Sequence, residues 1–392
     1  MKRICGFIMV LIMLLTGPAS AIAKVSRNEA KLLCLNIGKA DCMLLLYGNT
    51  NWLIDTGYEV TYNALKTALD EYQIDHLDGV FLTHCHEDHD GGLMPLAQSN
   101  IPVNAWYASS VWFDVEEGEH PAVLAAKERG EEVTWLSAGD IIPVDADTSF
   151  TVLGPLDINE ENENNNSLVL LFSSPAGSIL LCGDMKKDEE KDLLNAGNIP
   201  SCSLLKVGHH GDNGTFSKHF LTAVRPETAV ISTSTAQEPD TPAPSTLHKL
   251  KEIGCAAYVT QDFHDAVLFT LSNGNVTSVE DIIWENAPPR IIGITLDIDF
   301  ETDTITMRNT SKKPVSLNGY TIYSTKGDET LLLDDLFLKP DDSWIIGSRN
   351  AKVPVDQIWD EEYVWSNKKR DVGILYDPWG RQVVCADNGL ME

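Results

Sequence analysis

Basic residues are scarce in this chain of 392 residues, in which 29 Lys and Arg stand against 58 Asp and Glu. The formal net charge of −29 disfavours non-specific binding to nucleic acid or to anionic membranes, because both are themselves negatively charged. Hydrophobic residues make up 43% of the sequence, which is enough to form cores and argues against a disordered chain. The length predicts two domains of the usual ~100–200 residues each.

Long apolar runs are absent apart from one near the beginning of the chain. The run Ile8–Leu15 follows Lys2 and Arg3 and precedes the small residues Ala19–Ala23, which is the pattern of a secretory signal peptide. This run is shorter than the ~20 residues that a bilayer span needs. We therefore expect residues 1–23 to be removed and the mature protein to be secreted or extracytoplasmic.

The cysteines do not indicate a disulfide framework. Eight are present, and Cys5 lies in the expected signal peptide, which leaves an odd number. Several of the others lie inside apolar, strand-like runs such as Lys31–Leu35 and Ile179–Cys182. We therefore expect buried free thiols.

Residues that can hold a metal ion are concentrated directly after the apolar strand Gly79–Thr83. In an extended segment His84 and His86 project to the same side and can hold one ion, while Asp88 and His89 turn toward a second. Three histidines and several carboxylates packed after an apolar strand favour a metal site over a polar surface loop.

Two further strand ends can complete this site. Asp184 follows the apolar strand Ser178–Cys182, where a carboxylate can bridge two cations, and the strand Leu204–Val207 is followed by His209 and His210. Either of these histidines can be the last ligand. We expect a two-metal hydrolase site, with the ligands His84, His86, Asp88, His89, Asp184 and His209 and the catalytic residues Asp88, Asp184 and His210.

As a set, these motifs resemble the metallo-β-lactamase superfamily, most closely the extracellular hydrolase domain of the competence protein ComEC. The resemblance spans residues 31–271 and also includes Asn36–Asp41, Leu53–Gly57 and Asn164–Leu170. It implies an α/β fold, the four-layer αββα sandwich, with two divalent metal ions at one edge between the sheets. Zinc is the expected metal, with manganese as the alternative.

The chain departs from the superfamily pattern at two places. Many members have a third histidine on the first metal, whereas the matching segment here offers Asn165 or Asn166, so the first metal is expected to be weakly held. The segment Asp240–Pro242 lacks the histidine of a Gly-His-Pro motif. His264 lies near another family segment, and we expect an ordinary loop histidine there.

A Pro-rich boundary at Ala287–Arg290 separates a hydrolase domain, residues 24–287, from residues 288–392. Short strands separated by turns predict an all-β, immunoglobulin-like sandwich in the second domain. This domain resembles the lamin-tail domain, which implies targeting to a polymer or cell surface. The basic residues Lys368–Arg370, beside Trp365, can form a patch that binds a polyanion. They are equally typical of a solvated turn. Because every ligand precedes the boundary, we expect the first domain to fold and hydrolyse small substrates alone.

The sequence therefore predicts a secreted, metal-dependent hydrolase that cleaves a phosphodiester with a metal-bound hydroxide. The resemblance to ComEC implies nuclease activity on extracellular nucleic acid, although the acidic first domain counts against tight binding of a polyanion. Three alternatives stay open. They are a phosphodiesterase of choline-phosphate-type surface groups, an acyl hydrolase of a lactam, lactone or thioester, and a non-catalytic surface-binding protein. The intact ligand set argues against the last.

Overall fold

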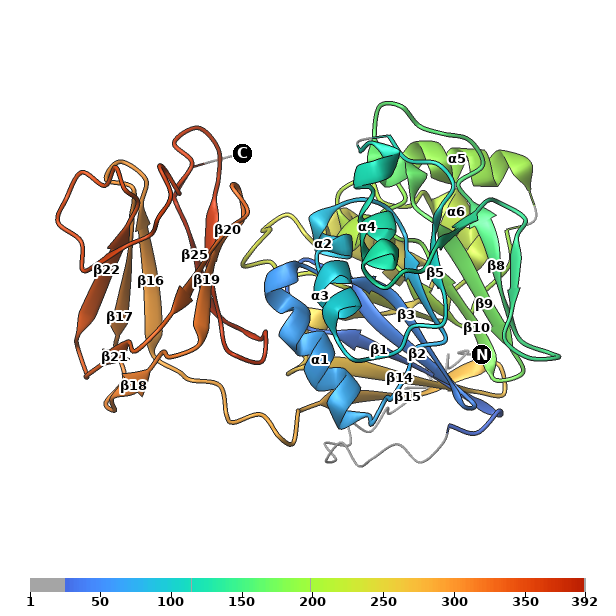
Figure 1. The fold of residues 1–392 in the computed structure, drawn as a ribbon. Helices are drawn as coiled ribbons and strands as arrows, with labels where there is room; N and C mark the ends of the chain where they lie inside the picture. Colours follow the sequence, from blue (N-terminus) through green and yellow to red (C-terminus); the bar gives the residue numbers. More distant parts are fainter. Residues whose placement is uncertain (1–24, 114, 198, 391–392) are drawn as a thin grey trace, which may run out of the picture.

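Two large sheets occupy the first part of the chain, and a group of smaller sheets follows them (Figure 1). The computed structural model describes residues 25–113, 115–197 and 199–390. The predicted signal peptide, residues 1–23, lies outside the described residues. Within the described ranges, no helix combines the length and the apolar character that a membrane crossing requires.

The first sheet has eight strands in the order β15-β14-β1-β2-β3-β4-β5-β6. Strands β3 to β6 are parallel neighbours, and the other pairs are antiparallel. In sheet order, the bounds are Asn275–Ile282, Ala266–Ser272, Glu29–Leu35, Cys42–Tyr47, Thr50–Thr56, Gly79–Leu82, Trp106–Ser109 and Val133–Leu136.

The second sheet has seven strands in the order β13-β12-β11-β10-β9-β8-β7. Strands β10 to β13 are parallel neighbours, and the remaining pairs are antiparallel. In sheet order, the bounds are Ala256–Val259, Thr228–Ile231, Leu204–Lys206, Gly177–Leu181, Val169–Ser174, Ser149–Gly154 and Ile141–Pro143.

Helices cover the outer face of each sheet. α1, α3 and α4 pack on the first sheet, and α5, α6 and α7 pack on the second. The helix bounds are Tyr62–Glu71 (α1), Glu87–Asp90 (α2), Leu93–Gln98 (α3), Pro121–Glu128 (α4), Lys187–Ala196 (α5), Lys218–Val224 (α6) and Pro244–Glu252 (α7). The short 3₁₀ helices are Glu59–Thr61 (η1), Glu117–Glu119 (η2), Glu163–Asn166 (η3), Gly208–Gly211 (η4) and Thr260–Asp262 (η5).

The apolar residues of the central strands are buried on both faces. In β9, Leu170 and Phe172 pack between the two sheets, whereas Val169 and Leu171 pack against the helices, because successive side chains in a strand point to opposite faces. The same alternation in β1 places Leu32 between the sheets and Leu33 under the helices. The predicted four-layer αββα sandwich is confirmed.

The C-terminal part of the chain is all-β, as predicted. Two four-stranded sheets, β16-β17-β22-β23 and β20-β19-β24-β25, and the pair β18-β21 enclose their own apolar core. From β16 to β25 the bounds are Ile294–Asp299, Thr304–Asn309, Val315–Ser316, Tyr320–Ser324, Glu329–Leu333, Phe337–Leu338, Ser343–Gly347, Gln357–Ile358, Val372–Tyr376 and Gln382–Asp387. The lamin-tail relationship and the domain bounds stay predictions. Each of the seven cysteines in the described residues is a free thiol, as expected.

Loops that follow three strand ends meet between the two sheets. The chain leaves β4 into the histidine motif, leaves β10 into Asp184, and leaves β11 into η4. Gly183 lies where these loops are closest, with a φ of +47°, and a Cβ there would come within 2.9 Å of the Cβ of Ser167 and 3.0 Å of that of Thr83. A glycine is therefore needed directly before Asp184.

Candidate metal centre

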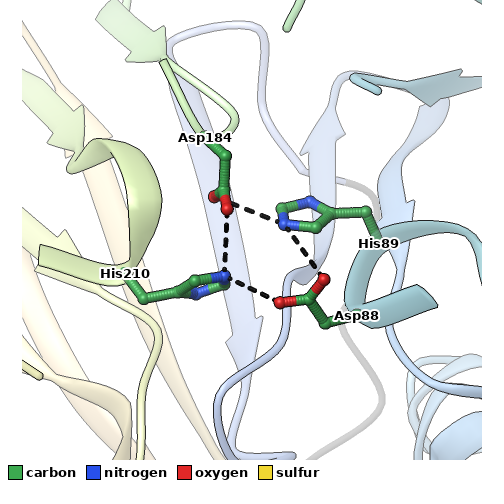
Figure 2. Close-up of side chains that lie close together, drawn as sticks. All are labelled: Asp88, His89, Asp184 and His210. Carbon is green, nitrogen blue, oxygen red and sulfur yellow. Dashed lines mark hydrogen bonds and ion pairs between the residues drawn. The ribbon is translucent and has the colours of Figure 1, made fainter. Parts of the chain in front are cut away.

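Four buried side chains from α2, the loop after β10 and η4 converge at this point (Figure 2). They are Asp88, His89, Asp184 and His210, and one potential ligand atom from each lies within 4.8 Å of all the others. His89 Nε2 is 3.3 Å from Asp184 Oδ1, and His210 Nε2 is 3.1 Å from Asp88 Oδ2 and 3.5 Å from Asp184 Oδ2. The cluster therefore brings together two imidazole nitrogens and two carboxylates.

The outer nitrogen of each imidazole is fixed by a buried acceptor. His89 Nδ1 donates to Asp55 Oδ2 at 2.8 Å, and His210 Nδ1 donates to the carbonyl oxygen of Ser232 at 2.8 Å. Asp55 is itself held by the backbone N–H and the hydroxyl of Thr83. Such partners set the tautomer and direct the Nε2 lone pair of each ring toward the cluster, as around metal-binding histidines.

The donor set fits a divalent cation. Apart from their contact with each other at 3.3 Å, His89 Nε2 and Asp184 Oδ1 are buried without a hydrogen bond in the described residues, although buried polar atoms are nearly always satisfied. Imidazole and carboxylate ligands together suit a first-row transition metal such as zinc or manganese. Asp88, His89, Asp184 and His210 are therefore the residues that would hold such an ion.

The side chains of His84 and His86 place a second pair of imidazole nitrogens beside this cluster. His84 Nε2 lies 3.0 Å from His86 Nδ1, and the rings of His84 and His89 have centroids 4.2 Å apart. His84 Nδ1 lies 3.1 Å from Thr83 Oγ1, which again directs Nε2 away from the core. The two nitrogens lie close together, and their predicted role in holding one ion stays a prediction.

The two asparagines expected in place of a third histidine have structural roles instead. Asn165 Oδ1 accepts from the backbone N–H of Lys186 at 3.2 Å, at the start of α5. The Asn166 side chain accepts from the Asn159 N–H and donates to the Asn159 carbonyl and to Glu163. Both amide oxygens therefore accept hydrogen bonds from the backbone, and the weakly held ion at His84 and His86 stays a prediction.

The structure places His210, and not His209, in the cluster, a choice that the sequence left open. His210 is fully buried in the cluster, whereas His209 Nε2 is 4.0 Å from Asp184 Oδ2 and its Nδ1 is 3.2 Å from Asp212 Oδ2. Both residues have left-handed backbone angles, with φ of 45° and 51°. This turn directs His210, rather than His209, toward Asp88, so we reassign the last metal ligand to His210.

Electrostatics in the cluster favour a cation. Burial alone would lower the pKa of His210, but Asp184 and Asp88 outweigh it and raise that pKa to about 9. Burial alone would raise the pKa of Asp184, but the imidazoles of His210 and His89 hold it well below its ordinary value. His209 differs, because its burial lowers its pKa to about 4 and leaves it neutral at pH 7.

Lys39 places a positive charge beside this acidic cluster. Its side chain is half-buried, and the carboxylates of Asp88 and Asp184 raise its pKa although burial alone would lower it. The backbone two residues after Lys39 is hydrogen-bonded to the site, since the N–H of Asp41 donates to the carbonyl of Asp88 at 2.9 Å. Deeper in the fold, the buried Lys206 ammonium lies 2.7 Å from Asp41 Oδ2.

The second domain contacts the rim of this site. Gln237 is buried; its Oε1 accepts from the backbone N–H of Lys39 at 2.7 Å, and its Nε2 donates to Tyr376 Oη at 3.3 Å and to Gln382 Oε1 at 2.9 Å. Tyr58, which follows the Asp55 loop, packs on the ring of Tyr323 with centroids 5.4 Å apart. The hydrolase domain predicted to act alone therefore has part of its rim held by the second domain.

The Gln237→Ala variant is expected to loosen the loop that carries Lys39. Leaving a buried N–H without its acceptor costs about 1–3 kcal/mol, so amide exchange at Gly38 to Asp41 should rise by about tenfold or more. The value of kcat/KM should fall with it. Hydrogen exchange and steady-state kinetics, with the exposed Gln98→Ala as control, measure both effects. Unchanged protection and unchanged turnover would refute this coupling.

Sequence reasoning assigned no role to Asp55, Ser232, Lys39 or Gln237. Asp55 is a carboxylate at the end of an apolar strand. The same pattern identified Asp184, so it could have identified Asp55 as well. Ser232 acts through its backbone carbonyl, which no side-chain pattern reveals. His264 is an exposed loop histidine, as expected, with Nδ1 2.6 Å from Asp281 Oδ2.

Comparison with known proteins agrees with this geometry. Residues 35–235, slightly more than half of the chain, match the family model described as the metallo-beta-lactamase superfamily. The chain belongs to this superfamily. It is therefore a metal-dependent hydrolase, with its metal-binding residues at the His and Asp cluster.

Two curated relatives are competence proteins. The chain is 28% identical over 223 residues to ComE operon protein 3 of Bacillus subtilis (strain 168), covering 52% of this chain and 28% of the relative. It is 28% identical over 271 residues to competence protein ComA of Neisseria gonorrhoeae, covering 67% of this chain and 36% of the relative. The chain thus spans about a third of the length of these relatives.

Among solved structures, a diphosphatase of the PhnP family is similar at 13% identity. The match covers 62% of this chain and 99% of the other, with a TM-score of 0.37.

Proposed function

We propose that this hydrolase cleaves phosphodiesters, that nucleic acid is its substrate, and that it acts outside the cytoplasm as a secreted protein. The proposal rests mainly on Lys39, a half-buried cation close to the carboxylates of a metal-binding cluster. An anionic phosphodiester carries charge that such a group neutralises, whereas a lactam carbonyl does not require a second cation beside the metals.

The residues of the site have distinct tasks in this reaction. A divalent ion, when bound, lowers the pKa of water and neutralises phosphoryl oxygens. Asp55 and the Ser232 carbonyl keep the imidazoles of His89 and His210 oriented. Asp184, which lies between both rings, accepts a hydrogen bond from the attacking water and orients it. Lys39 stabilises the negative charge that grows on the phosphoryl oxygens.

The choice of nucleic acid is supported by the relatives named as competence proteins. The overall charge of −29 opposes a polyanion at long range, but this repulsion is screened beyond ~8 Å at physiological ionic strength. Local cations at the site therefore decide binding more than the net charge does. Choline-phosphate esters and acyl substrates are the alternatives that the assay below separates.

Metal-loaded protein is expected to turn over an activated phosphodiester and to cleave single- or double-stranded DNA, with little turnover of a chromogenic lactam. The fold supports both phosphoryl and acyl chemistry, so only a parallel assay separates them. Each substrate should be supplied at matched concentration with added zinc and, separately, manganese.

The variant His264→Ala is the matched control, because this histidine is exposed and lies outside the cluster. It should retain wild-type turnover, whereas His210→Ala should lose nearly all of it. Robust lactam or lactone hydrolysis without phosphodiester cleavage would overturn the proposed substrate class.

A further inference from the structure

A hollow of about 250 Å³ opens beside the metal centre. Its wall includes Lys186 and Lys187 at the start of α5, His209 from the turn that carries the last metal ligand, and three asparagines, Asn162, Asn165 and Asn213. The hollow adjoins the cluster, because Lys186 is two residues from Asp184 and His209 Nε2 is 4.0 Å from Asp184 Oδ2. A substrate held at the metals therefore has this space next to it.

The two lysines give the hollow a positive charge. Lys187 lies across Gly214, since a Cβ at that glycine would come within 2.9 Å of Lys187 Cε and 3.0 Å of its Nζ. Lys186 is half-buried and close enough to His209 to help lower the pKa of that ring. One exposed carboxylate, Asp188, also lines the hollow, which leaves the net charge positive.

The three asparagines present donors rather than acceptors. Asn162 Oδ1 accepts from the N–H of Asn164 at 3.2 Å, Asn165 Oδ1 accepts from the N–H of Lys186 at 3.2 Å, and Asn213 Oδ1 accepts from Ser245 Oγ at 3.0 Å. With each oxygen occupied, the Nδ2 groups are left to donate. Asn165 is only 4% exposed, and its Nδ2 donates no hydrogen bond within the described residues.

We propose that this hollow is a subsite for the phosphate group next to the scissile one in a nucleic acid strand. Two ammonium groups and several amide N–H donors are the groups that bind phosphate oxygens in proteins. This inference rests on the proposed function and narrows it. A strand supplies an anion at the neighbouring position, whereas a choline-phosphate ester would place a quaternary cation there, against Lys186 and Lys187.

The test compares the double variant Lys186→Gln, Lys187→Gln with the control Lys191→Gln, an exposed lysine further along α5. The substrates are bis(p-nitrophenyl) phosphate, which has one phosphate, a labelled oligothymidylate, and p-nitrophenyl phosphorylcholine. Removing two charge-assisted hydrogen bonds should raise KM for the oligothymidylate by about tenfold or more. Turnover of the single-phosphate diester should stay within about twofold of wild type, as should every value for the control.

A binding measurement gives a readout independent of turnover. Anisotropy of a cleavage-resistant phosphorothioate oligothymidylate is followed with metal-loaded protein at increasing salt. The slope of log K against log salt changes by about 0.7 for each single-strand phosphate that the protein no longer neutralises, so losing the one phosphate contact should make the slope of the double variant shallower by about 0.7.

The two proposals fail in different ways. If wild-type protein cleaves neither phosphodiester, the proposed function is wrong. If wild-type protein cleaves both but the double variant keeps the wild-type KM and salt slope for the oligothymidylate, the subsite is wrong while the function stands. Preferential hydrolysis of the phosphorylcholine ester by wild-type protein would also overturn the subsite.

Discussion

The Asp184→Asn variant is expected to hydrolyse an activated phosphodiester with a kcat lower by about 10²-fold or more, the usual cost of removing one preorganised stabilising group. Asp184 lies 3.3 Å from His89 Nε2 and 3.5 Å from His210 Nε2, so its carboxylate contacts both imidazoles. Asparagine keeps the shape of the side chain but removes the charge that draws cations to the site.

Metal content has to be matched before the rates are compared, because a weaker ligand also lowers occupancy. Asp192→Asn, an exposed substitution on α5, controls for the loss of one negative charge and should retain wild-type kcat. An Asp184→Asn protein with equal metal content and full activity would show that the catalytic site has been misplaced.

The ligand loop and the sandwich fold could be predicted from the sequence, for different physical reasons. The four candidate ligands His84, His86, Asp88 and His89 lie within one short segment of the sequence, so their proximity follows from chain connectivity alone. The apolar strands are buried on both faces, and strands with this pattern are typical of a sheet covered on both sides. Asp184 was identifiable because it follows one of these strands.

The order of His209 and His210 could not be predicted, because both adopt left-handed backbone angles. Alternation along a strand says which side chain faces inward, but it ends at Lys206, the last residue of β11. A left-handed turn then reverses the directions that an extended chain would give. Only the folded position of Asp88 shows which histidine meets it.

The contacts between the two domains could not be predicted from the sequence either. Gln237 and Gln382 are 145 residues apart, and neither lies in a charged or conspicuous motif. Their hydrogen bond depends on how the second domain packs against Tyr58, which follows from shape rather than from local pattern. The independent folding and activity of the first domain stay predictions, while these contacts show that the two parts share a rim.

Metal removal is expected to abolish activity, and the two ions should leave in sequence. His89 and His210, with Asp88 and Asp184, would hold one ion with buried and oriented ligands. His84 and His86 would hold the other without a third histidine, because the matching segment has Asn165 and Asn166 instead. The ion at His84 and His86 should therefore leave first as chelator is added.

Elemental analysis during a chelator titration tests the central claim most directly, with wild-type protein, His210→Ala and His209→Ala purified without chelator. The wild type should contain two zinc or manganese ions per chain, lose them in two steps, and regain activity when the metal is restored. His210→Ala should lack one ion, because a cluster ligand is gone, whereas His209→Ala should retain both. A wild-type protein with no stoichiometric transition metal, and no gain in activity on adding zinc, manganese or iron, would contradict the account.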